Sequence, residues 1–303
     1  MKRALPLLFI ASLLPYSQAQ AALYVTVVQG LGGDDHWQAR FSDQQEKITE
    51  ASITMAGEAH VKSFTGDDAT RDNLMAHFRT LSTSMNDDDR LALYLIGHGS
   101  YDGEQYKFNI PGPDITDGDL AEILGTLPGR NHFVVNTSSA SGAMLDKVET
   151  DDRILVTATR NGNEKNATEF GDFFAAALTS DSADINKNNS ISIQEAFDYA
   201  ERQVASFFEN QSKLATEHPQ IRGDNAASFN LARVNVAETP DEDPRITQLL
   251  SQREALDAQI EELQLNRGRY TNAEYIQKLQ ALILESAEVG EQIDNLREGS
   301  ESR

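Results

Sequence analysis

Two short apolar segments, each ending abruptly in small polar residues, constrain this chain more than any other feature of its sequence. Residues 91–96 are wholly apolar and run into Gly97-His98-Gly99-Ser100, and residues 133–135 run into a serine-rich stretch, 136–142. Short apolar segments bounded by turn residues, with a helical pattern between them, predict parallel strands buried on both faces. Ligands of an open parallel sheet bind beyond the carboxyl ends of its strands. We therefore expect His98 and the serine cluster to face one crevice.

Strand and helix patterns alternate from residue 22 to residue 236. The alternation predicts one α/β domain with a mostly parallel sheet and helices on both faces. The chain has 303 residues, of which 39% are hydrophobic, so it can bury a sizeable core. The expected strands are 23–28, 60–64, 91–96, 133–135 and 154–156; the expected helices are 42–55, 67–81, one opened by Thr116 or Asp117, 170–178 and 193–208; residues 108–114 are expected in a long loop.

The last quarter of the chain differs in kind from the rest. Residues 237–244 form an acidic, proline-containing linker, in which Asp243 is a good N-cap before a proline at the first helical position. Apolar residues then recur at spacings of three, four and seven over residues 245–298, with a capping box at Thr271 and Glu274. The pattern predicts a coiled-coil-like helical hairpin, antiparallel within one chain, or an arm that joins two copies in a homo-oligomer.

The first 21 residues have the pattern of a secretory signal peptide. Lys2 and Arg3 precede an apolar stretch, 4–14, that is too short to span a bilayer, and Ala19-Gln20-Ala21 supplies a cleavage site of small residues. No later stretch is long and apolar enough for a transmembrane helix. We expect a periplasmic or secreted protein that does not span the membrane.

The net charge limits the kinds of partner that the chain can bind, and its cysteine content limits the kinds of nucleophile that it can have. Acidic residues number 48 against 26 basic ones, so the chain lacks the excess of cations that binds nucleic acid phosphates. Calcium or a basic peptide fits a net charge of −22 better. The absence of cysteine excludes disulfides and a thiol nucleophile. The glycine loop at 30–33 lacks the spacing of a dinucleotide fingerprint, and we expect no organic cofactor.

The order of the two polar motifs resembles that in the clan of cysteine peptidases that holds legumain, the caspases and the gingipains. Gly97-His98-Gly99 matches the clan's histidine motif, and Ser139-Ala140-Ser141-Gly142 stands where the clan has a cysteine followed by any residue, serine and glycine. The similarity covers about residues 23–204 and looks closest to the legumain-like family in bacterial secreted proteins. It implies a caspase/legumain-like fold and a peptide or protein as substrate or partner.

The resemblance also implies roles for individual residues. His98 corresponds to the clan's catalytic histidine, Ser139 replaces its cysteine, and the backbone N–H groups of Ser139 and Gly99 correspond to its oxyanion donors. A thiol can act with a single histidine, whereas a serine hydroxyl needs a base that is usually oriented by a carboxylate. Asp102 and Asp172 are both candidates for that carboxylate, and spacing selects neither.

Three interpretations of Ser139 follow. It is a relic in a pseudopeptidase that binds peptides or scaffolds partners, a working nucleophile that His98 activates, or a loop serine in an unrelated α/β fold. Ser138 is a second candidate nucleophile. Arg160, in the loop that lines the family's specificity site, and Ser141 are candidate substrate-binding residues. A solvated surface arginine explains Arg160 equally well, and Ser138 and Ser141 are more simply hydrogen-bonding turn residues.

A second, independent motif covers residues 184–195. Oxygen-bearing side chains occupy positions 1, 3, 5, 9 and 12 of this loop, the seventh residue offers its carbonyl, and Ile191 fills the hydrophobic eighth position, as in an EF-hand. With only two carboxylates, the loop predicts a weak calcium site. The alternative is an Asx-rich loop that ends in a helix capping box. The candidate ligands are Asp184, Asn186, Asn188, Ser190, Ser192 and Glu195.

Overall fold

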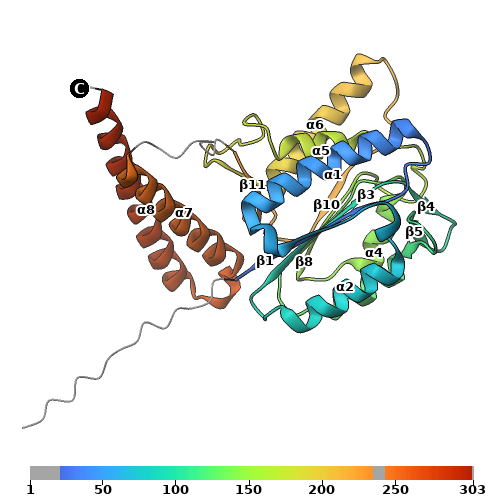
Figure 1. Ribbon diagram of the computed structural model, residues 1–303, viewed down its shortest axis with the longest axis horizontal. Coiled ribbons are helices and arrows are strands. Elements are labelled where there is room, and N and C mark those ends of the chain that lie inside the picture. The colour runs from blue at the N-terminus through green and yellow to red at the C-terminus, as the bar shows by residue number, and fades with distance from the viewer. Residues whose placement is uncertain (1–20, 235–242, 302–303) are drawn as a thin grey trace, which may run out of the picture.

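The computed structural model describes residues 21–234 and 243–301 (Figure 1). The expected signal peptide, apart from Ala21, and residues 237–242 of the expected linker lie outside these ranges. The described residues form an α/β body with a pair of long helices at one end. No helix within the two described ranges is long and apolar enough to cross a membrane.

A six-stranded sheet forms the centre of the body, in the order β10-β8-β7-β3-β1-β2. All neighbouring strands pair in parallel except β10, which pairs antiparallel with β8 at one edge. The mostly parallel sheet predicted from the sequence is therefore confirmed. The strands are β1 (Leu23–Gln29), β2 (Val61–Phe64), β3 (Arg90–Ile96), β7 (His132–Asn136), β8 (Arg153–Thr157) and β10 (Gln220–Arg222).

Helices cover both faces of this sheet, as predicted (Figure 1). One face carries α1, α5 and α6, and the other carries α2, α3 and α4. Two separate hydrophobic cores result, one on each side of the strands. The helices are α1 (Asp35–Ala56), α2 (Arg71–Ser84), α3 (Asp117–Gly125), α4 (Leu145–Val148), α5 (Phe170–Ala177) and α6 (Ile193–Asn210).

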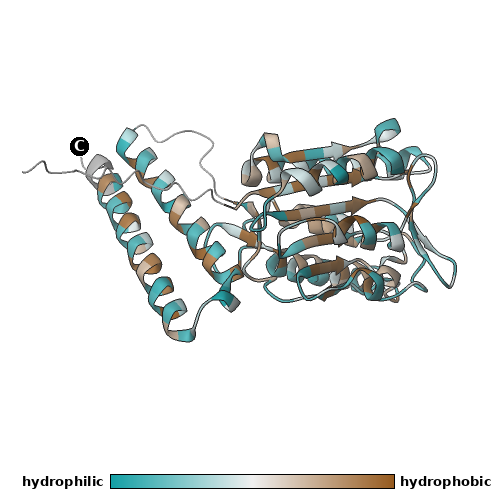
Figure 2. Cartoon of the chain, turned by 90° about the horizontal axis from the view of Figure 1, so that it is seen from below, coloured by the Kyte–Doolittle hydropathy of each residue, from teal (hydrophilic) through white to brown (hydrophobic). Residues whose placement is uncertain are grey.

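Strand β3 shows why the central strands read as continuous apolar segments. Successive side chains of a strand point to opposite faces of the sheet. Leu93 accordingly packs into the core beneath α2, and its neighbour Tyr94 packs into the core beneath α1. Because both faces are covered, every residue from 91 to 96 is buried. Figure 2 shows the same apolar colouring along the strands of the body.

Two helices begin at other residues than predicted, because capping side chains fix their first turns. Helix α1 begins at Asp35 rather than at residue 42, because the side chain of Asp34 accepts a hydrogen bond from the backbone N–H of Trp37 at 2.9 Å. Helix α2 begins at Arg71 rather than at residue 67, with Thr70 as its N-cap. Both caps shift a boundary without changing the order of elements.

The sequence patterns miss two small antiparallel sheets. Strands β4 (Gly99–Tyr101), β5 (Tyr106–Phe108) and β6 (Ile115–Thr116) pair within a region predicted as a long loop. Strand β9 (Ser190–Ser192) pairs with β11 (Asn230–Arg233). Strands of two to four residues are too short to display the alternation by which strands are recognised.

The C-terminal helices α7 (Pro244–Leu265) and α8 (Asn272–Glu301) pack against each other within the chain. Ile246 and Leu256 of α7 are buried with Val289 and Ile293 of α8. The predicted N-cap Asp243 and the capping box of Thr271 with Glu274 are both present. The predicted seam therefore closes a hairpin, and a homo-oligomer would need a different face, such as the exposed apolar side chains Ile276, Ile283 and Leu284.

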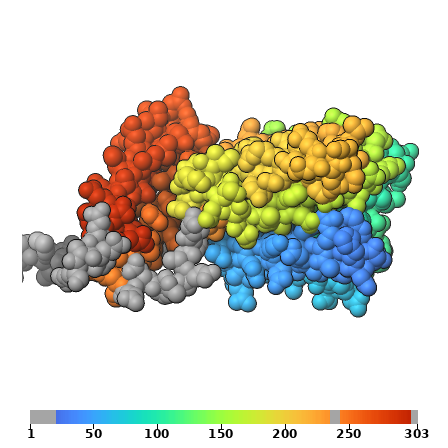
Figure 3. Space-filling model, turned by 90° about the horizontal axis from the view of Figure 1, so that it is seen from above, coloured from blue at the N-terminus to red at the C-terminus, as the bar shows by residue number. Residues whose placement is uncertain are grey.

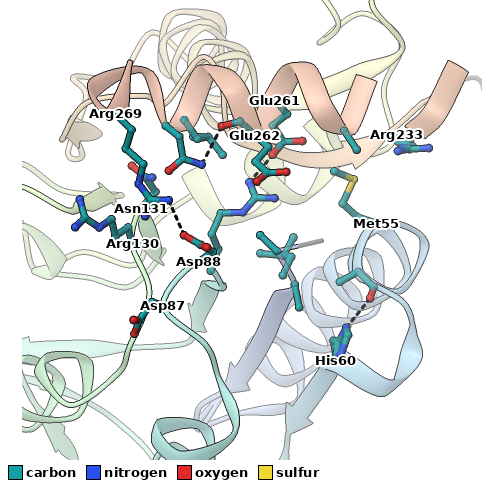
Figure 4. A pocket seen from close by; sticks show the side chains of 18 residues that line it. Met55, His60, Asp87, Asp88, Arg130, Asn131, Arg233, Glu261, Glu262 and Arg269 are labelled. Atoms are coloured by element: carbon teal, nitrogen blue, oxygen red, sulfur yellow. Dashed lines mark hydrogen bonds and ion pairs between the residues drawn. The ribbon is translucent and has the colours of Figure 1, made fainter. Parts of the chain in front are cut away.

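The hairpin contacts the amino-terminal end of the sheet (Figure 2), and Figure 3 shows it beside one end of the α/β body. The carboxylate of Glu261 on α7 forms an ion pair of 2.5 Å with Arg90, the first residue of β3. A cavity of about 300 Å³ lies beside this pair, and Asp88, Glu262 and Arg269 line it among others (Figure 4). The carboxyl ends of the strands lie at the opposite end, about 20 Å away along a strand of this length.

Candidate active site

His98 and Ser139 lie beyond the carboxyl ends of two adjacent parallel strands. Strand β3 pairs with β7, and Leu95 is the register partner of Asn136. The pairing continues one residue further, where the backbone N–H of Thr137 donates to the carbonyl of Leu95 at 3.0 Å. His98 and Ser139 each follow three residues after the last register partner, so they leave the sheet at the same level. The predicted adjacency of the two strands is confirmed.

Gly99 brings the two turns into direct contact. A Cβ atom at this position would lie 2.5 Å from Ser138 Oγ and 2.6 Å from the carbonyl oxygen of Ser139. Real Cβ atoms do not approach other atoms this closely, so only glycine fits there without displacement of the serine turn. The residue after His98 therefore touches the backbone of Ser139.

The turn that carries Ser139 has an unusual backbone. Ala140, the next residue, has φ = 56°, a left-handed conformation that costs an alanine free energy. The backbone N–H of Ala140 donates to the carbonyl of Glu164 at 2.8 Å, which fixes this conformation. Within the described ranges, the backbone N–H and the hydroxyl of Ser139 have no hydrogen-bond partner, and the residue is 4% exposed. The Ser139 N–H, which the resemblance assigns to the oxyanion hole, thus makes no hydrogen bond within the described residues.

Ser138, the second candidate nucleophile, is held by the structure. Its hydroxyl hydrogen-bonds to the hydroxyl of Tyr106 at 2.6 Å and donates to the carbonyl of Ser139 at 3.2 Å. Tyr106 also accepts a hydrogen bond from the side chain of Asn136, and burial raises the pKa of its phenol. Ser138 therefore serves a buried polar network, and Ser139 is the better candidate of the two.

Aromatic side chains of α1 pack around the His98 ring. Trp37 and Phe41 meet it edge-on, with ring centroids 5.3 and 5.0 Å from that of the imidazole. Across residues 21–234 and 243–301, no carboxylate forms a hydrogen bond or ion pair with the imidazole of His98. The ring is thus positioned by packing, without the carboxylate that usually orients a base for serine.

Both carboxylates proposed from the sequence as orienters are engaged elsewhere. Asp102 accepts hydrogen bonds from the backbone of Gln105 and Glu104 and from Lys107, which lower its pKa. Asp172 pairs with Arg40 of α1 and accepts a hydrogen bond from the side chain of Gln44. Neither prediction of an orienting carboxylate is supported by a contact to His98.

A family model described as the peptidase C13 family matches residues 48–226. This span is more than half of the chain and contains both His98 and Ser139. The chain belongs to the peptidase C13 family. The predicted likeness to legumain-like peptidases is confirmed at the level of the family, and peptidase-family membership implies a protein substrate. Since this C13 chain has no cysteine, it has no thiol nucleophile.

Two solved structures resemble the C13 chain over most of its length. A structural-genomics protein of Geobacter sulfurreducens is 11% identical, with a TM-score of 0.47, over 71% of this chain and 98% of that one. Caspase-1 of Spodoptera frugiperda is 12% identical, with a TM-score of 0.42, over 72% of this chain and 92% of that one. No curated protein matches the sequence.

The two candidate substrate-binding residues of the C13 chain differ in exposure. Ser141 is fully buried, and its hydroxyl hydrogen-bonds to that of Thr159 at 3.2 Å, joining the loops after β7 and β8. Arg160 is exposed, and its guanidinium lies 3.6 Å from the carboxylate of Glu164. Ser141 therefore holds two loops together, while Arg160 faces solvent at the same end of the sheet.

An ionic cluster lies beside His98, and Asp172 is its only member named as a candidate from the sequence. Arg40 stacks over Trp37 at 4.5 Å, forms an ion pair with Glu169 at 2.7 Å, and pairs with Asp172. Arg40 is about 130 residues from its two acidic partners along the chain, so no local sequence pattern predicts these ion pairs. Because Trp37 contacts both Arg40 and His98, the cluster forms part of the wall next to the imidazole.

The loop 184–195 of the C13 chain folds around its two carboxylates. Asp184 accepts hydrogen bonds from the backbone of Asn188 and Asn189, and Glu195 accepts them from Ile185, Asn186 and Ser192. The capping box of Ser192 and Glu195 is present at the start of α6. In the described part of the chain, no group of three His, Cys, Asp or Glu residues could hold a metal.

Proposed function

We propose that the chain is a peptide-binding member of the peptidase C13 family that hydrolyses peptide bonds at most slowly. A peptide carbonyl placed at the end of β7 would meet the unused N–H of Ser139, as in the family's oxyanion site. The second half of the proposal, that hydrolysis is at most slow, is based on the hydroxyl that replaces the thiol. Unlike a thiol, it needs an oriented base, and no described carboxylate contacts the ring of His98.

The second candidate function is serine-dependent hydrolysis of peptide bonds. In this case Ser139 attacks the peptide carbonyl, His98 transfers the proton, and backbone N–H groups, including that of Gly99, stabilise the oxyanion. The contact between Gly99 and the Ser139 turn favours this candidate, because it places the two motifs at one point.

A fluorophosphonate probe separates the two functions. We expect no labelling of the purified chain between pH 5 and pH 9, because an unactivated serine hydroxyl is a poor nucleophile. The Ser139→Ala and His98→Ala variants serve as controls and should be indistinguishable from the unmodified chain. Labelling that disappears in both variants would establish the serine hydrolase and overturn the peptide-binding proposal.

We also propose that residues 184–195 bind calcium weakly. Two features support this: the backbone N–H of Asn188 bonds to oxygens of both Asp184 and Asn186, and Glu195 reaches the start of the loop. First and last candidate ligands are thereby close together. A site with two carboxylates fits a dissociation constant on the order of 10⁻⁴ to 10⁻³ M, the range of extracellular modules.

Calcium at ten times its dissociation constant is expected to stabilise the chain by about 1.4 kcal/mol and to raise its melting temperature by a few degrees. Differential scanning fluorimetry in calcium and in chelator measures this shift. Glu195→Gln is the test variant, because it removes a charged ligand; its amide oxygen can keep the capping box, and its NH₂ group then faces the N–H groups of Ile185 and Asn186. An equal shift in Glu195→Gln, or no shift in the unmodified chain, would contradict the site.

We further propose that the chain is exported to the periplasm or outside the cell and is cleaved after Ala21. Cleavage there would leave Ala22 as the first residue, immediately before β1. The backbone nitrogen of Ala22 lies 2.8 Å from a carboxylate oxygen of Asp89, which would pair with the new ammonium group. Amino-terminal sequencing of the exported chain tests this assignment.

A further inference from the structure

We propose that Glu164, braced by His218, is a positioning residue that holds the Ser139 turn in its observed conformation. The inference rests on the proposed function in one respect: it explains how the turn keeps the conformation in which a peptide carbonyl can meet the N–H of Ser139. Its structural part stands on contacts among three loops.

The backbone of Glu164 holds the turn directly. Its carbonyl accepts the N–H of Ala140 at 2.8 Å, and Ala140 is the left-handed residue immediately after Ser139. A left-handed alanine reverts to an ordinary conformation unless its surroundings fix it. The Glu164 carbonyl therefore fixes the peptide group that joins Ser139 to Ala140, and with it the turn that carries Ser139.

The side chain of Glu164 fixes that carbonyl in turn. One carboxylate oxygen accepts the backbone N–H of Arg160 at 2.9 Å and that of His218 at 3.1 Å. The other accepts a hydrogen bond from Nδ1 of His218 at 2.7 Å. Both oxygens face only donors, and the side chain is 13% exposed. A carboxylate accepts all three bonds with the strength of a charged acceptor, whereas a neutral amide accepts the two backbone N–H groups more weakly and keeps its bond to Nδ1 only if the imidazole changes its tautomer.

The topology brings these groups to the end of the sheet at which β3 and β7 end. Ser139 and Glu164 follow the parallel strands β7 and β8, and His218 precedes β10, which is antiparallel. The beginning of β10 therefore lies at the same end as the ends of β7 and β8. Glu217 anchors this segment, because its buried carboxylate accepts the backbone N–H groups of Glu169 and Phe170.

Hydrogen–deuterium exchange of the full chain tests the structural part. In Glu164→Gln, the amide of Ala140 is expected to exchange at least about tenfold faster, while the amides of β1 and β3 keep their rates. His218→Ala removes only the ring contact and is expected to have a smaller effect. Glu149→Gln, a matched change at an exposed ion pair with Arg222, should change nothing at Ala140. Unchanged exchange at Ala140 in Glu164→Gln, or faster exchange throughout the sheet, would overturn the inference.

A second experiment measures the reactivity of a thiol at position 139, and its result is independent of the exchange rates. In a Ser139→Cys background, Glu164→Gln is expected to lower the rate of alkylation by iodoacetamide about tenfold, and Glu149→Gln is expected to leave it unchanged. If the introduced thiol is no more reactive than a free cysteine, the oxyanion-site geometry that the proposed function assigns to the Ser139 turn fails, and the exchange experiment still decides the role of Glu164. If the thiol is reactive and Glu164→Gln leaves its rate unchanged, the positioning role fails alone.

Discussion

Replacing Ser139 by cysteine is expected to give a chain that hydrolyses peptides with a thiol nucleophile. A thiol is a few per cent thiolate at neutral pH and intrinsically strongly nucleophilic, so it needs less from its base than a hydroxyl does. His98, positioned by Trp37 and Phe41, is a sufficient partner for it. Removing a general acid–base residue typically costs a factor of 10² to 10⁴, so Ser139→Cys with His98→Ala should lose about that much activity. Cleavage of a fluorogenic peptide mixture measures both chains.

The absence of any other cysteine makes this experiment unambiguous, because every thiol reaction reports on the introduced residue. Ser138→Cys is the matched control. Its thiol would replace a buried hydroxyl that is bonded to Tyr106, so we expect neither hydrolysis nor rapid alkylation. Hydrolysis at the same rate in Ser138→Cys, or a rate in Ser139→Cys that does not depend on His98, would disprove the geometry proposed for the site.

The meeting of His98 and Ser139 at one end of the sheet is predictable because it depends only on the order of buried strands. An apolar segment that stops at a glycine marks where a strand ends, and parallel strands end on the same side. The predicted ends of 96 and 135 differ from the observed ends, Ile96 and Asn136, by at most one residue. These patterns are local, and burial on both faces makes them strong.

The surroundings of the two residues could not be predicted, because they come from distant parts of the chain. Trp37 and Phe41 reach His98 from a helix whose predicted start, residue 42, leaves both outside it. The carbonyl that holds Ala140 belongs to Glu164, and the side chain that holds Glu164 belongs to His218. The periodicity and spacing of residues in the sequence do not predict contacts between such distant residues. The sequence therefore predicts the position of the candidate site, and the structure shows the neighbouring residues that determine what His98 and Ser139 can do there.

The docking of the hairpin is another contact between distant residues, since Arg90 and Glu261 are 171 residues apart. Sequence periodicity predicted the hairpin and its seam correctly, because both depend on spacings within the two helices. It did not predict that the hairpin packs on the body. Glu261 is an acidic residue on a long helix, a position at which a solvated carboxylate is the ordinary expectation. Its side chain is nevertheless only 5% exposed.

Glu261→Ala is expected to lower the free energy of unfolding by about 3 kcal/mol, the cost of breaking a buried ion pair by removing one partner. Three donors lose their acceptor: the guanidinium of Arg90, at 2.5 Å, and the backbone and side-chain N–H groups of Asn230, at 3.3 and 3.1 Å. Arg90 also stacks over Phe229 at 4.9 Å, so the uncompensated charge would remain against an aromatic ring in the interface. Urea denaturation followed by circular dichroism measures the loss.

Glu262→Ala is the matched control, because Glu262 is the next residue of α7, lines the same cavity and is exposed (Figure 4). We expect its effect to stay within about 0.5 kcal/mol, as for other surface substitutions. Glu261→Gln should fall between the two, since its amide keeps an acceptor for Asn230 but loses the charge that Arg90 requires. Equal stabilities of the Glu261→Ala and Glu262→Ala chains would show that the ion pair does not hold the hairpin on the body. The contacts of Leu265, which is buried in the core beneath α1, and the ion pairs of Arg233 with Glu254 and of Arg269 with Asp88 would then remain to do so.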